Sequence, residues 1–298
     1  MGTVTATRSG FVALAGRPNV GKSTLVNAMV GHKVAIVSDK PQTTRRAIRG
    51  VATGPDWQLV LVDLPGVQRP RDALTTRMQS RVERELADSD AALMIVNGLE
   101  GIGPGDRFIA EALRKTSTPV IVAVNKVDKL TDAKLMEVLQ ATADLEVGDE
   151  IYPISAKKST GLEPLMDRLR GLLPVGPFYY DPSEESDQTE ATLVAELIRE
   201  QVLRRTFQEV PHAVEVMIDS IEKERDDLIR VTAFAWVETN SQKGILIGAQ
   251  GKMIKAIGTA ARRELQRELG MKVHLDLSVR VRKDWRGDDR ALDRLGIE

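Results

Sequence analysis

The chain has 298 residues, of which 42% are hydrophobic and 29% charged, and its formal net charge is −1. This length and composition predict two globular domains and exclude a largely disordered chain, while the near-neutral charge gives no overall sign of a nucleic-acid-binding protein. The absence of cysteine excludes disulfides and thiol catalysis, and with only three histidines a zinc site is not expected.

Short apolar runs recur in the first part of the chain, with helical stretches between them. They are rich in Val, Ile and Leu and do not alternate with polar residues, which is typical of strands buried on both faces of a parallel sheet. The pattern predicts an α/β domain over residues 8–173 with a doubly wound, mostly parallel sheet. The runs cover residues 11–15, 57–63, 91–96, 119–125 and 151–155.

The first run leads directly into GRPNVGKST, which has the spacing of a phosphate-binding P-loop between a strand and a helix. Gly16 and Gly21 allow the backbone to curl so that its N–H groups point at phosphate oxygens. Lys22 is expected to reach the β- and γ-phosphates, and Ser23 to be a ligand of Mg²⁺. The expected nucleotide-binding residues here are Gly16, Arg17, Pro18, Asn19, Val20, Gly21, Lys22, Ser23 and Thr24.

The second apolar run ends in the motif DLPG, the first motif after the P-loop that is expected to contact the nucleotide. Asp63 can hold Mg²⁺ through water, and the N–H of Gly66 can meet the γ-phosphate. The expected site therefore includes Asp63, Leu64, Pro65 and Gly66.

Two further motifs decide between adenine and guanine, which a P-loop alone does not distinguish. NKVD and SAK each end a strand, at the carboxyl edge of the sheet where ligands bind in such folds. The carboxylate of Asp128 matches the two N–H donors on the guanine edge, which adenine lacks, so GTP is the expected nucleotide. The motifs add Asn125, Lys126, Val127, Asp128, Ser155, Ala156 and Lys157 to the expected site.

The order GRPNVGKST, DLPG, NKVD and SAK resembles the translation-factor-related GTPases. The resemblance implies a GTPase that binds GTP and GDP with Mg²⁺. It also implies that a threonine of the segment KPQTTRR closes over Mg²⁺ and the γ-phosphate, and both Thr43 and Thr44 remain candidates. Catalytic roles are thus expected for Lys22, Thr43, Thr44 and Gly66, and metal ligation for Ser23, Thr43, Thr44 and Asp63.

Two positions bear on the rate of hydrolysis. Val67 stands where Ras-like enzymes carry the glutamine that orients the attacking water, so slow intrinsic turnover is expected. Asn19 resembles the asparagine that related GTPases use to coordinate K⁺. The alternative is that Asn19 only shapes the loop.

Composition changes after Leu173. Residues 174–190 are rich in proline and acidic residues and read as an interdomain linker. Beyond it, a helix is expected from Thr189 or Thr192 to about Phe207, followed by two half-buried strands, two helical stretches near 251–258 and 259–269, and a third strand. This order predicts an α+β domain over residues 191–298, with the topology of a type II KH domain and a C-terminal tail.

The KH assignment depends on a G-x-x-G loop, Gly248 to Gly251, within ILIGAQGKMIKAIG. Such a loop lets a single-stranded nucleic-acid backbone approach closely. The segment from Lys243 to Arg286 contains eleven basic residues and four acidic ones, so the near-neutral charge of the whole chain conceals a basic region. The expected RNA-binding residues are Ile247, Gly248, Ala249, Gln250, Gly251, Lys252, Lys255, Arg280, Arg282 and Lys283.

Nearly the whole chain, including the ending VRVRKDWRGDDRALDRLG, resembles the bacterial ribosome-assembly GTPases that carry a KH domain. The resemblance implies binding to the 3′ end of 16S rRNA, a role in 30S subunit assembly and 16S rRNA maturation, and peripheral contact with the cytoplasmic membrane. Residues 1–10 lack the apolar core of a secretion signal, so a cytoplasmic location is expected. A monomer is expected as well.

The sequence leaves two other functions to consider. In the first, the protein is an RNA-binding checkpoint in which GTP is mainly a structural ligand, and hydrolysis measured with and without RNA distinguishes it from a switch. In the second, the protein is a tandem GTPase, which the single P-loop argues against.

Overall fold

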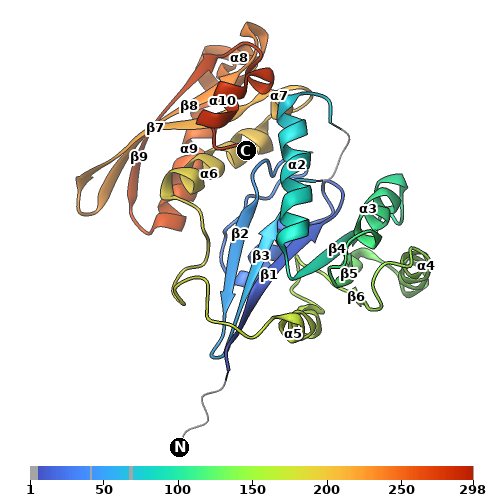
Figure 1. Cartoon of the computed structure of the whole chain (residues 1–298). Coiled ribbons are helices and arrows are strands. Elements are labelled where there is room, and N and C mark those ends of the chain that lie inside the picture. The colour runs from blue at the N-terminus through green and yellow to red at the C-terminus, as the bar shows by residue number, and fades with distance from the viewer. Residues whose placement is uncertain (1–5, 41, 67–69, 298) are drawn as a thin grey trace, which may run out of the picture. The chain divides into compact units, whose positions relative to one another are not determined.

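The structure, a computed structural model, describes residues 6–40, 42–66 and 70–297. It forms two compact units (Figure 1). The first unit consists of Met1–Ala35, Thr44–Arg71 and Thr75–Asp187, and the second of Ile36–Thr43, Asp72–Leu74 and Gln188–Glu298. The acidic segment up to Asp187 therefore belongs to the first unit, and residues 36–43, which include part of the segment KPQTTRR, belong to the second.

A six-stranded sheet, in the order β2-β3-β1-β4-β5-β6, forms the centre of the first unit. The strand pairs are parallel except for the antiparallel pair β2–β3. The five predicted strands are confirmed, whereas β2 was not predicted. Its sequence IRGVAT is short and contains Gly50, whose missing Cβ leaves room for Val26 of the neighbouring helix. The strands are β1 (Arg8–Ala15), β2 (Ile48–Thr53), β3 (Trp57–Asp63), β4 (Ala91–Asn97), β5 (Val120–Asn125) and β6 (Ile151–Pro153).

Helices cover both faces of this sheet, as expected for a doubly wound domain. α1 and α5 pack on one face through residues such as Leu25 and Leu165, and α2 and α3 pack on the other through Val82 and Ile109. Each connection returns the chain so that the parallel strands end at one edge, where the predicted nucleotide motifs lie. The helices are α1 (Lys22–Val30), α2 (Ala73–Asp88), α3 (Pro104–Arg114), α4 (Asp132–Ala143) and α5 (Leu162–Leu172).

The expected linker packs along the first unit as far as Asp187. The buried side chain of Gln58 accepts hydrogen bonds from the N–H groups of Tyr179 and Tyr180, at 2.8 and 3.0 Å, and donates to the carbonyl of Tyr180 at 2.9 Å. Further on, Ser186 forms a bridge to Gly50 on the edge strand β2. This segment is therefore pinned by hydrogen bonds rather than free of contacts.

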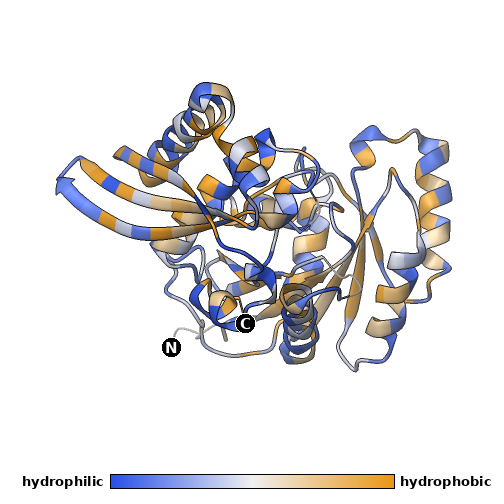
Figure 2. Ribbon diagram, turned by 90° about the horizontal axis from the view of Figure 1, so that it is seen from above, coloured by the Kyte–Doolittle hydropathy of each residue, from blue (hydrophilic) through white to orange (hydrophobic). Residues whose placement is uncertain are grey.

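The second unit has a three-stranded sheet, β7-β8-β9, in which β7–β8 is antiparallel and β8–β9 parallel. Apolar and polar bands alternate along these strands in Figure 2, which agrees with a sheet that has only one face on the helical core. The elements are α6 (Glu190–Arg205), α7 (Val210–Ala213), β7 (Glu215–Arg225), β8 (Leu228–Val237), α8 (Asn240–Ile247), α9 (Lys252–Leu269), β9 (Lys272–Val281) and α10 (Asp289–Arg294). None of the helices in the described ranges is both long and apolar enough to cross a bilayer.

The two helices between β8 and β9 differ from the prediction. The expected stretches 251–258 and 259–269 form one helix, α9, and the other helix, α8, precedes the glycine loop. Gly258 does not interrupt α9, and a side chain there would meet no other atom within 4 Å. The start of α8 is marked by a capping box between Thr239 and Gln242, a signal that the sequence contained.

A fully buried arginine holds the segment 36–43 within the second unit. Arg199 of α6 forms an ion pair with Glu196 at 2.6 Å, lies 3.8 Å from Glu215, and donates a hydrogen bond to the carbonyl of Thr43. Because an unpaired buried charge is costly, these carboxylates are what allow the guanidinium to reach the segment.

Candidate functional site

The phosphate loop follows β1 and ends at the first turn of α1. Asn19 and Gly21 have left-handed backbone conformations, with φ of 64° and 104°. A Cβ at Gly21 would lie 2.3 Å from Nδ2 of Asn125, so glycine is required by both the backbone angle and the close approach. The loop therefore curls at the N-terminus of a helix, which favours anions.

Lys22 lies inside this loop, and its ammonium group donates hydrogen bonds to the carbonyls of Gly16 at 3.0 Å and Arg17 at 3.1 Å. Burial lowers the pKa of Lys22 to about 8, against the opposing effect of the Asp63 charge. The amine is thus placed where phosphate oxygens can replace the two carbonyls as its partners.

Three oxygen ligands suited to Mg²⁺ meet beside Lys22. The hydroxyl of Ser23 donates to Asp63 at 2.6 Å, and the hydroxyl of Thr44 lies 3.2 Å from Asp63 and 3.1 Å from Ser23. One carboxylate and two hydroxyls form a hard donor set of the kind that Mg²⁺ prefers, so these residues fit the ion. Thr43 instead donates its hydroxyl to the carbonyl of Lys40 at 2.6 Å. Of the two candidate threonines, the geometry favours Thr44.

The DLPG motif approaches the phosphate loop closely. A Cβ at Gly66 would lie 2.8 Å from Pro18, so only glycine allows this contact. Leu64 is fully buried at the end of β3 and anchors the motif. Val67, which bears on the position of the attacking water, lies outside the described residues.

The predicted base-binding motifs come together as expected. The side chain of Asn125 donates to the carbonyl of Val20 at 2.9 Å and accepts from the N–H of Ala156 at 3.0 Å. Asp128 lies in a short 3-10 helix, where its Oδ1 accepts a hydrogen bond from Ser155 at 2.7 Å. NKVD, SAK and the phosphate loop therefore form one hydrogen-bonded arrangement.

Lys126 completes this arrangement. Its ammonium group donates to the carbonyl of Asn19 at 2.7 Å. Burial is the largest effect on the pKa of Lys126, which is lowered, although the nearby Glu100 opposes the change. By contrast, Lys157 of SAK has an exposed side chain.

In the second unit, the predicted G-x-x-G loop joins α8 to α9. Gly248, Gln250 and Gly251 all have positive φ, at 70°, 52° and 74°. A side chain at Gly251 would meet no atom within 4 Å, so one side of the loop is open to a nucleic-acid backbone. Lys252 begins α9 directly after the loop.

A groove of about 500 Å³ lies between α9, the helix that follows this loop, and the edge strand β9. Lys255 was predicted to bind RNA and lies in the groove wall, but most of the lining residues were missed. Spacing could have identified three of those on the helix, since Gly258, Thr259 and Arg262 follow Lys255 at intervals of three, four and seven residues. The lining residues are Ile254, Lys255, Gly258, Thr259, Arg262, Leu275, Asp276 and Leu277.

Two of the predicted RNA contacts lie elsewhere. The guanidinium of Arg280 stacks over Phe234 at 3.2 Å, and that of Arg282 over Trp236 at 5.5 Å. Arg280 projects from β9 on the face opposite Val279, which packs with α8 and α9, and Arg282 directly follows the last residue of the strand. Their role in RNA binding stays a prediction, as does that of the exposed Lys283.

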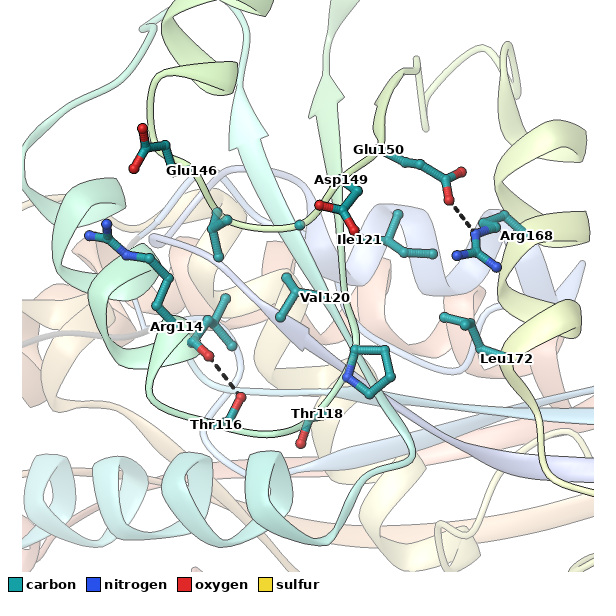
Figure 3. Close-up of a pocket in the computed structure, with 14 residues that line it drawn as sticks. Arg114, Thr116, Thr118, Val120, Ile121, Glu146, Asp149, Glu150, Arg168 and Leu172 are labelled. Carbon is teal, nitrogen blue, oxygen red and sulfur yellow. Dashed lines mark hydrogen bonds and ion pairs between the residues drawn. The ribbon is translucent and has the colours of Figure 1, made fainter.

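Another cavity, of about 270 Å³, lies at the start of β5 in the first unit (Figure 3). Its wall carries charges of both signs, including the ion pair between Arg168 and Glu150 at 2.6 Å. None of the nucleotide motif residues lines it. We assign it no part in nucleotide binding.

Comparisons with known proteins divide the chain in the same way. Residues 11–126 match the family described as 50S ribosome-binding GTPase, and residues 209–286 match the KH domain. The first match spans the P-loop, DLPG and the start of NKVD, and the second spans the glycine loop and the groove.

Full-length relatives and structures are similar over both units. The chain is 46% identical to GTPase Era of Mycobacterium tuberculosis (strain ATCC 25618 / H37Rv), and to that of Mycobacterium avium (strain 104), over 99% of this chain and 100% of each relative. A crystal structure of Era in complex with MgGDPNP and nucleotides 1506-1542 of 16S ribosomal RNA has 34% identity, covers 98% of this chain and 99% of its own, and gives a TM-score of 0.93. A variant of Aquifex aeolicus Era bound to GDP.AlF4− has 33% identity, the same coverage and a TM-score of 0.93. With the P-loop, NKVD, SAK and a glycine-loop KH domain all in place, this chain belongs to the Era family of GTPases.

Proposed function

We propose that this GTPase binds the 3′ end of 16S rRNA through the groove of its KH domain, and that it acts in the cytoplasm on 30S subunit assembly and 16S rRNA maturation. The groove between α9 and β9 carries the proposal, because its wall has apolar and basic residues beside the one carboxylate of Asp276, and the glycine loop that precedes α9 is open at Gly251. The identity of the RNA rests on the related Era structure that contains nucleotides 1506-1542 of 16S ribosomal RNA.

The groove suits a single strand rather than a duplex. The open side of Gly251 admits a phosphate, which Lys252 and the N-terminus of α9 attract. Lys255 and Arg262 can continue this contact along the helix, while Leu275 and Leu277 offer apolar surface to unstacked bases.

The nucleotide site supplies the other half of the function. Lys22 and the N–H groups of the phosphate loop bind the phosphates, and Asp128 accepts from the guanine edge. When bound by Ser23, Thr44 and Asp63, Mg²⁺ neutralises charge on the phosphates. The N–H of Gly66 is proposed to orient the γ-phosphate.

The decisive experiment is to cross-link the full chain to RNA in cells with ultraviolet light, recover it through an affinity tag and sequence the attached RNA. Reads are expected to concentrate at the 3′ end of 16S rRNA. Reads spread over unrelated RNAs would show that the groove holds RNA without this preference and would end the 30S proposal.

We also propose that K⁺ accelerates hydrolysis through Asn19. Asn19 has φ of 64°, a conformation that glycine adopts freely, so Asn19→Gly removes the side chain and keeps the turn. If the side chain holds the ion, this variant loses the difference between rates in K⁺ and in Na⁺. If Asn19 only shapes the loop, the variant keeps that difference.

A final part of the proposal is that the protein is a monomer with peripheral contact to the inner face of the cell membrane. The resemblance to ribosome-assembly GTPases supports it. Flotation with vesicles of neutral and of anionic lipid tests the membrane contact. Recovery of the protein only in the unbound fraction with both kinds of vesicle would refute that contact.

A further inference from the structure

The arginine of the phosphate loop is anchored outside all four nucleotide motifs. The Nε atom of Arg17 lies 2.7 Å from Oδ2 of Asp106 on α3, and its Nη1 lies 3.0 Å from Oε2 of Glu100 in the loop after β4. A third contact, at 3.3 Å, runs from Nη2 to the carbonyl of Gly101. The guanidinium is therefore held by α3 and by the loop that precedes this helix.

The first turn of α3 is shaped around this side chain. Asp106 is fully buried, and in addition to its ion pair with the arginine its Oδ2 accepts a hydrogen bond from the N–H of Gly103 at 2.9 Å. A Cβ at Gly105 would lie 2.7 Å from Cδ of Arg17, so the helix has no side chain where the arginine passes. Removal of Arg17 would leave a buried carboxylate without its cation, which is costly.

The anchor also reaches the base-binding side of the site. Glu100 accepts a second hydrogen bond from Nδ2 of Asn97 at 2.6 Å, and its charge acts on Lys126. Lys126 in turn donates to the carbonyl of Asn19, two residues beyond Arg17. The phosphate loop is thus held at Arg17 by α3 and at Asn19 by NKVD.

The loop needs such anchors because its backbone is strained. Asn19 is in the left-handed region, with φ of 64°, a conformation that residues other than glycine seldom adopt. The carbonyl of Arg17 is also a hydrogen-bond acceptor for Lys22, so a shift of this residue moves the phosphate-binding amine.

We propose that Arg17 is a positioning residue for nucleotide binding, whose side chain, clamped by Glu100 and Asp106, holds the phosphate loop in its binding conformation without contact to the nucleotide. The proposal uses only the nucleotide site and is independent of any RNA partner. Since the loop serves the phosphates that GDP and GTP share, loss of the clamp weakens both nucleotides alike.

The test compares Arg17→Gln with the matched control Arg107→Gln, an exposed arginine on α3 next to Asp106. Affinities for GDP and for a non-hydrolysable GTP analogue are measured with fluorescent nucleotides, together with the thermal unfolding of each nucleotide-free protein. Arg17→Gln is expected to weaken both nucleotides by about 10- to 100-fold, the range found when a group that supports metal ligands is removed. Arg107→Gln is expected to match the wild type.

The partner variants separate a clamp from a direct contact. Asp106→Asn should weaken both nucleotides in the same way, and the double variant Arg17→Gln/Asp106→Asn should cost less than the two single losses combined, because they disrupt one interaction. The double variant also removes the uncompensated buried charge, so it keeps the test valid if a single variant unfolds.

Several outcomes would overturn the proposal. Unchanged affinities in folded Arg17→Gln, or a lower unfolding temperature with unchanged affinities, would leave Arg17 with a purely structural role. Loss of the GTP analogue alone would mean that Arg17 touches the γ-phosphate. Wild-type affinity in folded Asp106→Asn would rule out the clamp.

Discussion

Asp128 is held by Ser155 so that its carboxylate has one oxygen fixed at 2.7 Å from a hydroxyl donor. Asp128→Asn replaces an acceptor for guanine by a donor, and the loss of a buried charge-assisted pair costs about 2 to 5 kcal/mol. We therefore expect GTP to bind much more weakly and xanthosine triphosphate to bind better than GTP. Competition between the two nucleotides measures this, and wild-type GTP affinity in the variant would show that another group reads the base.

At Lys22, protonation and nucleotide binding are linked. Burial lowers its pKa to about 8, below the ordinary value of 10.5, so above pH 8 the unbound amine is largely neutral. Phosphate favours the charged amine, so binding at higher pH takes up a proton. Affinity should fall as the pH rises above 8, by at most about tenfold per pH unit.

The same lowered pKa of Lys22 has the opposite effect on the stability of the nucleotide-free protein. Between pH 8 and 10.5 the unfolded chain binds more protons at this lysine, so stability without nucleotide rises with pH. The measurement is the affinity for GDP as a function of pH. Because the pKa of Lys126 is lowered as well, the same measurement on Lys126→Met separates the effect of Lys22 from that of Lys126. An affinity that stays constant from pH 7 to about 9.5 in both proteins would refute the role given to Lys22.

The two threonines next to each other in the chain should respond differently to truncation. Thr44→Ala removes a hydroxyl beside Asp63 and Ser23, and it should raise the Mg²⁺ concentration needed for hydrolysis by at least about tenfold. Thr43→Ala removes only a hydrogen bond to the carbonyl of Lys40 and is the control. A larger effect on Mg²⁺ dependence from Thr43→Ala would reverse the assignment.

At the scale of elements, the continuous apolar strands were easy to predict and the antiparallel edge strand β2 was not. The parallel strands are continuous apolar runs, whereas β2 pairs on one side only and carries Arg49 and Gly50 in its sequence. In the second unit the two helical stretches expected near 251–258 and 259–269 are one continuous helix, because local propensity is a weak guide where the packing of Ile257 and Ala261 holds both sides.

The groove follows from α9 and β9 as elements, so variants on α9 test it. Gly248 is a poor target, because its φ is 70° and a Cβ would meet Met253 at 2.7 Å. Arg262→Glu places a negative charge in the groove wall, and Arg263→Glu, an adjacent exposed position outside the lining, is its control. Anisotropy at several salt concentrations should show weaker RNA binding for Arg262→Glu alone.

The salt dependence should become shallower as well. Each lost phosphate contact on a single strand lowers the slope of log affinity against log salt by about 0.7. Equal binding by the two variants, with equal slopes, would mean that general basic charge rather than the groove holds the RNA.

For the whole molecule, local motifs predicted the nucleotide site far better than its supports. Each of the four motifs, the P-loop, DLPG, NKVD and SAK, is a short unbroken stretch of sequence, so its residues can be identified without the fold. The contacts of Arg17 with Asp106, and of Arg199 with Thr43, join residues far apart in the chain, and only the fold brings them together. The segment 36–43 belongs to the second unit for the same reason.

The most direct measurement is the single-turnover rate of GTP hydrolysis by the full chain, with and without RNA carrying the 3′ end of 16S rRNA, for the wild type and for Arg262→Glu. If the protein is an RNA-coupled switch, the RNA changes the wild-type rate and leaves the rate of the groove variant unaltered. A wild-type rate that is the same with RNA fully bound as without it would contradict the coupling and make GTP a structural ligand of an RNA-binding protein.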